Sequence, residues 1–237
     1  MELKIYKDKN EVAKQFSEYF LELVEGTSIF HVALSGGSTP KIVFDLLATE
    51  FSSKIDWSKI HFYWGDERCV PPTDDQSNYK MTVAHLFSKV DVPQEHIHRI
   101  LGENDPNTET KRYGELLTEH LPLENGIPQF DLVILGMGDD GHTASIFPYE
   151  IELWDSNKNC EVAIHPDSGQ RRVTLTGKVI NNAKEVAFLV TGEGKAEKVT
   201  SILEKKKGYM EYPASLVQPN SGNLVWFMDA DAAKELT

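Results

Sequence analysis

Hydrophobic and polar positions follow two alternating patterns along the chain. Residues 10–24 carry apolar side chains at helical spacing, with Asn10 in the position of an N-cap. Residues 131–135 contain an unbroken apolar run, as expected of a strand that is covered on both faces. Further strands are predicted over residues 29–34, 60–64, 97–100, 162–164, 173–176, 186–190 and 224–227, and further helices over residues 40–48, 78–87, 108–120 and 194–203.

This alternation predicts an α/β fold with a largely parallel sheet that is flanked by helices on both faces. The 237 residues contain no internal repeat, low-complexity tract or linker. We therefore expect a single domain over residues 1–237.

The composition argues against several classes of protein. A net charge of −13 is unfavourable for nucleic-acid binding, which needs an excess of Lys and Arg. No apolar run approaches the ~18 residues of a membrane span, and the first residues lack the pattern of a secretory signal. Cys69 and Cys160 lie far apart and form neither a disulfide framework nor a zinc pattern. We expect a cytoplasmic monomer whose partner is a small molecule, with no nucleic acid and no membrane.

Glycines follow four of the predicted strands. They lie in residues 35–40, 65–68, 136–142 and 191–195, and three of these loops also carry ionisable residues. Ligands of parallel α/β sheets bind at the carboxyl ends of the strands. We therefore expect the four loops to converge on one site.

The first of these loops has the features of a phosphate site. Gly36 and Gly37 let backbone amides face a ligand, and Ser38 and Thr39 add hydroxyls where a helix begins. An N-capping turn would explain the hydroxyl residues but not the paired glycines, and the Gly-Lys-Ser/Thr ending of a Walker loop is absent. Lys195 opens another predicted helix, where a cation opposes the helix dipole, so it is best explained by a shared anion.

Three glycines of the third loop, Gly136, Gly138 and Gly141, spell the dinucleotide-binding pattern G-x-G-x-x-G. We reject a dinucleotide site, because Pro148 interrupts the long helix that such a loop must open. The acidic residue that would bind a ribose about 20 residues further on is also missing.

Residues of the same loop suit hydrolysis. His142 can exchange a proton near neutral pH, and Asp140 can orient the imidazole. No serine lies in a nucleophile-elbow motif, so water would be the attacking group. The alternative is a capping aspartate beside a surface histidine, and Asp139 is expected to be a solvated turn residue.

Arg68 follows two carboxylates, Asp66 and Glu67. Its guanidinium could clamp a phosphate, stabilise an oxyanion, or form a self-neutralising ion-pair cluster with its neighbours. The sequence leaves open which carboxylate faces the site. It also leaves open whether Arg171 or Arg172, which open a later strand, reaches the same pocket.

Taken in order, these segments resemble the 6-phosphogluconolactonases, and the resemblance spans most of the chain. The matching stretches are SGGSTP (35–40), WGDER (64–68) with VP (70–71), SNY (77–79), LGMG (135–138), DGHTAS (140–145) with FP (147–148), RVTLT (172–176), GKA (194–196) and YPAS (212–215), together with Trp226 and Asp229.

The resemblance implies a modified Rossmann-like fold, shared with glucosamine-6-phosphate deaminases and ribose-5-phosphate isomerases. It also implies hydrolysis of 6-phospho-D-glucono-1,5-lactone to 6-phospho-D-gluconate in the oxidative pentose phosphate pathway, with no metal or organic cofactor. His142 would be the base, with Asp140 and Arg68 as further catalytic residues. Asp139 stands where the family often has a proline, which should alter loop stiffness more than chemistry. The residues that would bind the substrate and its phosphate are Gly36, Gly37, Ser38, Thr39, Asp66, Gly141, Arg172 and Lys195.

Two other functions are alternatives. A glucosamine-6-phosphate deaminase of the same superfamily needs a Glu five residues after the loop histidine and an Asn just before it, but Phe147 and Ile146 stand there. A non-catalytic sugar-phosphate-binding module of a regulator needs a helix-turn-helix, for which we expect no segment. Such a module also has little use for Asp140 and His142.

Overall fold

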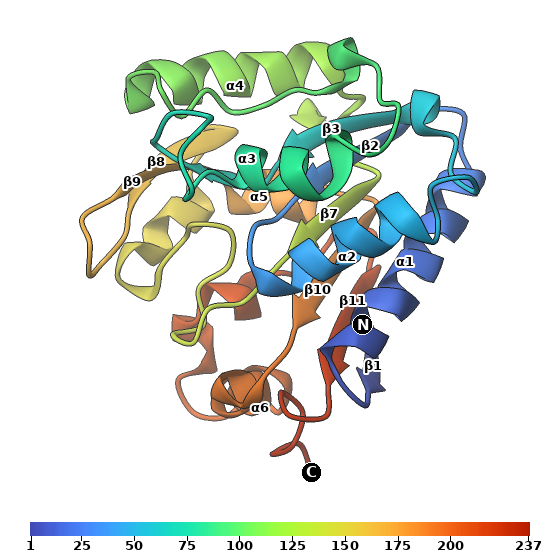
Figure 1. The fold of residues 1–237 in the computed structure, drawn as a ribbon. Coiled ribbons are helices and arrows are strands. Elements are labelled where there is room, and N and C mark those ends of the chain that lie inside the picture. Colours follow the sequence, from blue (N-terminus) through green and yellow to red (C-terminus); the bar gives the residue numbers. More distant parts are fainter.

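The centre of the fold is a six-stranded sheet in which all strands are parallel (Figure 1). The computed structural model describes residues 1–237. The order along the sheet is β1-β11-β10-β7-β2-β3. These strands are β1 (Glu2–Tyr6), β2 (Phe30–Leu34), β3 (Ile60–Trp64), β7 (Leu132–Leu135), β10 (Glu185–Val190) and β11 (Leu224–Asp229).

Six α-helices surround the sheets. They are α1 (Lys9–Glu25), α2 (Ser38–Thr49), α3 (Asn78–Thr82), α4 (Pro106–His120), α5 (Gly177–Asn181) and α6 (Ala196–Leu203). A π-helical turn spans Val83–Phe87, and 3₁₀ segments span Trp57–Lys59, Gln94–His96, Pro148–Asp155, Glu193–Lys195, Tyr209–Glu211 and Pro213–Leu216.

The helices cover both faces of the parallel sheet, which confirms the predicted fold class. Neighbouring residues of a strand point to opposite faces. Phe227 of β11 packs edge-on against Phe16 of α1, with ring centroids 5.3 Å apart, whereas Trp226 lines a groove together with Ile202 and Leu203 of α6. Helices α1 and α6 therefore lie on opposite sides of β11.

A hydrophobic cluster of 55 buried residues forms the core between the sheet and the helices. Strand β7 is buried along its whole length, which explains why its four residues are all apolar. None of the helices combines the length and the hydropathy that crossing a membrane requires.

A second, antiparallel sheet lies outside the main one. It contains β4 (Asp66–Arg68), β9 (Arg171–Leu175) and β8 (Cys160–Ile164), in the order β4-β9-β8. The strands predicted over 162–164 and 173–176 thus exist, but they do not join the parallel sheet. The pairing of β4 with β9 places Arg68 opposite Arg172, so it brings two distant segments to one place. A short hairpin, β5 (Leu123–Glu124) with β6 (Ile127–Pro128), forms a third, two-stranded sheet.

Three details of the predicted elements differ from the structure: one helix cap, one missing strand and one additional strand. Helix α1 is capped by Asp8, whose carboxylate accepts from the N–H groups of Asn10 (2.9 Å) and Glu11 (3.1 Å), so Asn10 is not the cap. The strand predicted over 97–100 is reduced to one bridge between Ile97 and Phe62. Residues 2–6 form a strand that was not predicted, although Glu2-Leu3-Lys4-Ile5 alternates polar and apolar residues; it is an edge strand, and most of its side chains are exposed.

Candidate active site

The four glycine-containing loops meet at one edge of the sheet. They follow β10, β7, β2 and β3, which are consecutive neighbours in the parallel sheet, so their carboxyl ends lie together. A cavity of about 250 Å³ opens there. Its lining residues are Ser35, Gly36, Gly37, Asp66, Arg68, Asn78, Gly136, Met137, Gly138, His142, Ala144, Arg172 and Lys195. A larger groove of about 450 Å³, lined by residues of α4 and by residues 158–161, contains none of the four loops.

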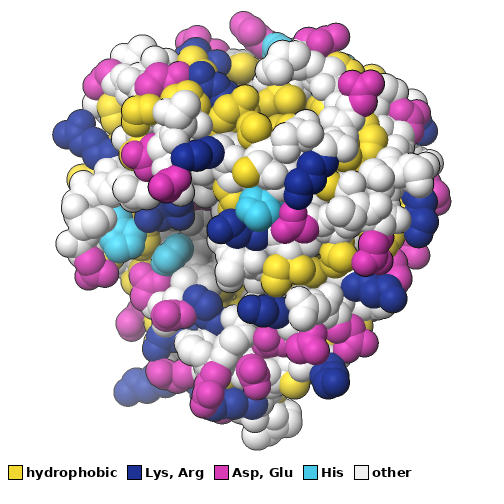
Figure 2. Space-filling view, viewed as in Figure 1, with side chains coloured by type: hydrophobic (Ala, Val, Ile, Leu, Met, Phe, Trp, Pro, Cys, Tyr) yellow, Lys and Arg dark blue, Asp and Glu magenta, His cyan; other side chains and the backbone are white.

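The cavity concentrates positive charge on an acidic protein. Arg68, Arg172 and Lys195 line it, against the single carboxylate of Asp66, although the chain as a whole carries −13. In Figure 2, several Lys, Arg and His side chains lie around a recess left of the centre, and Asp and Glu side chains are spread over the whole of this face. Charges beyond about 8 Å are screened at physiological salt, so this local arrangement decides what the cavity attracts.

His142 and Asp140 form a close pair in the loop after β7. The imidazole Nδ1 lies 2.7 Å from Asp140 Oδ1, which also accepts from the His142 backbone N–H at 3.1 Å. Burial opposes ionisation of Asp140, but the hydrogen bonds and charge of His142 outweigh it and lower the pKa of the carboxyl to about 2. An ionised carboxylate can only accept, so Nδ1 is the donor. In a neutral imidazole this leaves Nε2 free to take up a proton.

Two glycines give the loop its shape. A Cβ on Gly138 would lie 2.2 Å from Nδ1 of His142, so only glycine lets the imidazole rest on the loop backbone. Gly141 has a φ of +83°, and a Cβ there would lie 2.8 Å from the side chain of Tyr212. Gly141, which was predicted to contact substrate, does not line the cavity; Asp140 does not line it either, but it contacts His142, which does.

The two carboxylates of β4 have different environments, which settles the choice that the sequence leaves open. Asp66 lines the cavity and accepts a 2.7 Å hydrogen bond from the buried hydroxyl of Ser145. Glu67 points away and binds the start of α3, accepting from the N–H groups of Asn78 and Tyr79, both at 2.8 Å. Burial raises the pKa of Glu67, against the effect of these hydrogen bonds. Only Asp66 can face a ligand.

Of the two neighbouring arginines, Arg172 lines the cavity and Arg171 is exposed. The Arg172 guanidinium lies 5.6 Å from the ring centroid of Phe147, and the ring of His142 lies 4.6 Å from the same ring. Burial lowers the pKa of Arg172, although the charge of Asp66 partly opposes this. Phe147 thus packs against both the cation and the imidazole.

Arg68 enters the cavity from β4. Its Nη1 donates to the Gln76 carbonyl at 2.6 Å, while its Nε is buried and has no hydrogen-bond partner in the protein. A buried guanidinium N–H without a partner is costly. Because Nε is shut off from solvent, a ligand in the cavity would meet the terminal Nη groups of Arg68 rather than Nε.

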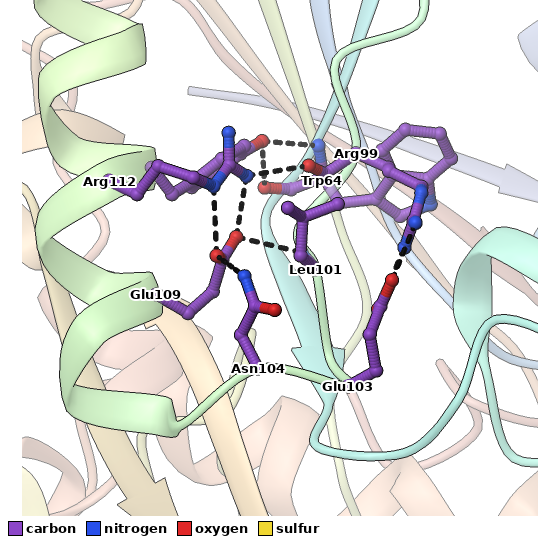
Figure 3. Close-up of polar contacts among 8 residues, drawn as sticks. Trp64, Arg99, Leu101, Glu103, Asn104, Glu109 and Arg112 are labelled. Atoms are coloured by element: carbon purple, nitrogen blue, oxygen red, sulfur yellow. Dashed lines mark hydrogen bonds and ion pairs between the residues drawn. The ribbon is translucent and has the colours of Figure 1, made fainter.

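A buried network on α4 fixes the loop that lies behind Arg68 (Figure 3). The Glu109 carboxylate accepts from the Leu101 N–H at 2.7 Å and from Asn104 Nδ2 at 3.1 Å. Arg112 donates to the same carboxylate through Nη2 (2.6 Å) and Nε (2.8 Å) and reaches the Arg99 carbonyl at 3.0 Å. Residues 99–104 are thereby held at three points.

That loop and α4 support the segment from Trp64 to Arg68. Gly102 lies directly against the backbone, since a Cβ there would come within 2.4 Å of the Arg68 carbonyl oxygen. The hydroxyl of Tyr113 accepts from the Trp64 N–H (2.9 Å) and donates to the Trp64 carbonyl (3.1 Å). Because β3 is an edge strand, Tyr113 takes the place of a missing neighbour strand.

The predicted phosphate loop borders a second cavity of about 180 Å³, lined by residues 36–40, 136–137, 189–191 and 195. Helix α2 begins there with Gly37 as its N-cap, at a φ of +113°, and no side chain caps its N–H groups. Ser38 and Thr39 line this second cavity rather than the first, and Thr39 Oγ1 lies 2.7 Å from Thr191 Oγ1. Lys195 lines both cavities.

Asp139 is more than the solvated turn residue that the sequence predicts. Its Oδ1 lies 2.5 Å from Lys195 Nζ, although its side chain is 78% exposed. Residues 139 and 195 are remote in sequence, and no local pattern indicates this pair.

Sequence reasoning missed Asn78 and Ser145. Asn78 lines the cavity, and its Nδ2 donates to the Asp66 carbonyl at 3.0 Å. Ser145 links Asp66 to Arg172, whose Nη1 lies 3.4 Å from the Ser145 hydroxyl. Both residues fall in stretches that match the family, which was the available signal. No group of three or more His, Cys, Asp or Glu side chains is arranged to hold a metal ion.

Comparisons with known proteins agree with the geometry. Residues 7–226 match the family described as glucosamine-6-phosphate isomerases/6-phosphogluconolactonase. A 6-phosphogluconolactonase of Treponema pallidum (strain Nichols) is 44% identical over 202 residues, covering 85% of this chain and 84% of the relative. One of Haemophilus influenzae (strain ATCC 51907 / DSM 11121 / KW20 / Rd) is 44% identical over 207 residues and 87% of each chain.

Solved structures show the same likeness. The crystal structure of devB protein is 43% identical with a TM-score of 0.95, covering 100% of this chain and 99% of that one. The 6-phosphogluconolactonase from Trypanosoma brucei is 28% identical with a TM-score of 0.89, covering 100% and 98%. A monomeric glucosamine-6-phosphate deaminase, at 19% identity and a TM-score of 0.81 over 99% of both chains, shares the fold. The chain therefore belongs to the glucosamine-6-phosphate isomerase/6-phosphogluconolactonase family and, within it, to the 6-phosphogluconolactonases, which are lactone hydrolases.

Proposed function

We propose that the protein hydrolyses 6-phospho-D-glucono-1,5-lactone to 6-phospho-D-gluconate, as in the oxidative pentose phosphate pathway, with His142 as the general base. The observation that carries the proposal is the hydrogen bond of His142 Nδ1 to the ionised Asp140 carboxylate, which leaves Nε2 as the proton acceptor. Asp140 also stabilises the imidazolium that forms when His142 takes up a proton.

The reaction needs one base and a polarised carbonyl. The oxygen of a water molecule bonds to the lactone C1 while one water proton moves to Nε2 of His142, and the carbonyl electron pair moves onto its oxygen. When this oxyanion collapses, the bond from C1 to the ring oxygen breaks and the ring oxygen takes the proton from His142. The resulting carboxylic acid then ionises. A positioned base contributes about 10²–10⁴-fold, which suits a lactone because it is already an activated ester.

We assign the cations by the cavity that each one lines. Arg68 and Arg172 share the cavity of His142 but do not line the one at the start of α2. The guanidinium of Arg68, which lines the cavity beside His142, suits the developing oxyanion, because hydrogen-bond donors that face developing charge lower the barrier most. Lys195 and the N–H groups at residues 37–39 suit the phosphate, which a helix N-terminus attracts.

The test is lactonase activity and its dependence on His142. The purified protein should convert freshly prepared lactone well above the spontaneous rate, measured as NADPH formation by excess 6-phosphogluconate dehydrogenase. His142→Ala should lower kcat about 10²–10⁴-fold and still bind 6-phosphogluconate. His165→Ala is the matched control, since His165 packs on the same Phe147 ring, at 5.3 Å, without lining the cavity. Undiminished turnover of His142→Ala would disprove the base assignment.

A deaminase activity is disfavoured by the residue at position 147. A deaminase needs a glutamate at this position for proton transfer, whereas this chain has Phe147, which is buried and packs on His142. No ammonia should be released from glucosamine 6-phosphate. A non-catalytic module would show neither reaction while binding 6-phosphogluconate.

We further propose that one chain, folded as a single domain over residues 1–237, is the complete catalytic unit. The loops that line the two cavities follow neighbouring strands of one continuous parallel sheet. Light scattering should give the mass of one chain, and thermal unfolding should show one transition. The cytoplasmic location stays a prediction that rests on the composition and on the two unpaired cysteines, Cys69 and Cys160.

A further inference from the structure

Lys195 stands between the two cavities and already has an anionic partner. Its ammonium lies 2.5 Å from Asp139 Oδ1, and the lysine lines both the His142 cavity and the cavity at the start of α2. The lysine side chain is 22% exposed, whereas that of Asp139 is 78% exposed. An exposed carboxylate thus pairs with a largely buried cation that lines both cavities.

The position of Asp139 is specific to this lysine. A Cβ on Gly194 would lie 3.5 Å from Asp139 Oδ1, so the carboxylate lies over the turn that carries Lys195. Glu193, on the same turn, pairs with Lys234 instead. Asp139 also directly precedes Asp140, so the pair ties the phosphate-side lysine to the loop of the catalytic base.

We propose that Asp139 is a specificity-determining residue that competes with the phosphate of the ligand for Lys195. This inference rests on the proposed assignment of Lys195 to phosphate binding. A phosphate that approaches Lys195 must displace the carboxylate or share the ammonium with it, and it meets the repulsion of a like charge. Asp139 therefore weakens the binding of every phosphorylated ligand.

The kinetic consequence follows from the shared phosphate of substrate and product. An interaction that affects both ligands and the transition state equally changes KM and the inhibition constant of the product without changing the chemical step. Asp139 thus raises both constants together and favours product release. A lactone without a phosphate is not affected, so Asp139 also reduces the preference for phosphorylated substrates.

The experiment compares Asp139→Asn with the unmodified enzyme on two substrates. For 6-phosphogluconolactone we expect KM, and the inhibition constant of 6-phosphogluconate, to fall together by roughly 1.5- to 5-fold, the range of an exposed ion pair. The kcat for this substrate should stay within about two-fold, unless product release limits the rate, in which case it falls. With unphosphorylated glucono-1,5-lactone, kcat/KM should not change. In 1 M salt the difference in KM should shrink, because the screening length drops to about 3 Å.

Glu193→Gln is the matched control, because it also removes one negative charge near Lys195, but from a residue that pairs with Lys234 instead. An equal fall in KM for this control would show a general field effect and overturn the proposal. A rise in KM for Asp139→Asn would also overturn it, since Asp139 would then hold Lys195 in place for the ligand. Unchanged constants in Asp139→Asn would overturn it as well.

Lys195→Ala separates this inference from the proposed function. If Lys195→Ala leaves KM and the inhibition constant unchanged, Lys195 does not bind the phosphate. The proposed competition by Asp139 then fails as well. If Lys195→Ala weakens binding but Asp139→Asn does not strengthen it, only the competition fails. In the Lys195→Ala background, Asp139→Asn should have no further effect on either constant.

Discussion

Replacing Gly102 with alanine tests whether the loop behind Arg68 controls the reaction. The added methyl would lie 2.4 Å from the Arg68 carbonyl oxygen and 2.7 Å from that of Val70. Ordinary contacts begin at 3.4 Å, so one of the two backbones must move by about 1 Å. Because Glu109 holds the loop of Gly102 in place, we expect the strand that carries Arg68 to move instead.

The size of the effect follows from these distances. Overpacking of this kind costs about 1–3 kcal/mol, which lowers Tm by roughly 2–12 °C in a chain of this size. Misplacing a catalytic group by about 1 Å costs up to about 100-fold in rate. We therefore expect kcat/KM for the lactone to fall by about 10- to 100-fold, mainly through kcat, because Arg68 shares its cavity with His142.

The assay compares kcat/KM of the single and double variants at Gly102 and Arg68, and it includes a matched control variant. Gly114→Ala, on α4, adds a methyl that meets only the Asn159 Cβ at 3.6 Å, so it should keep full activity and gain up to about 1 kcal/mol. In the Arg68→Ala background, Gly102→Ala should cause no further loss of kcat/KM. An equal further loss there, or an undiminished kcat/KM of Gly102→Ala alone, would refute the reasoning.

Three further predictions concern the pair with His142, the edge of β3 and the acid response. Asp140→Asn should lower kcat by about 10²–10⁴-fold with little change in KM, because Nδ1 loses its anionic partner; an unchanged kcat would contradict this. Tyr113→Phe should destabilise the protein by about 1–3 kcal/mol in urea unfolding, since two buried backbone groups of Trp64 lose their partner; wild-type stability would contradict this. His61 and His98, 3.2 Å apart, each have a pKa lowered to about 4 by burial and then by neighbouring histidines. The unfolded chain binds their protons from about pH 6.5, so stability should fall between pH 6.5 and 4 by roughly 1–3 kcal/mol. His98→Asn should flatten that dependence, and an equally steep profile would count against it.

Much of the fold and of the catalytic loop could be predicted from local patterns. The unbroken apolar run of β7 indicates a buried parallel strand, because no polar side chain is tolerated when both faces are covered. The spacing of Asp140 and His142 is also local, since two residues of one tight turn meet without help from the rest of the fold. Pro148 excludes the dinucleotide interpretation in the same way, and no α-helix begins at that loop.

Contacts between distant residues were decided by the tertiary structure alone. The choice of Asp66 over Glu67, and of Arg172 over Arg171, depends on how β4 pairs with β9, and a strand of three charged residues has no apolar pattern to reveal it. The pair of Asp139 with Lys195 joins the ends of two different strands. Hydrophobic periodicity tells which face of an element is buried, whereas the partner of a polar side chain depends on where the folded sheet places a residue remote in sequence.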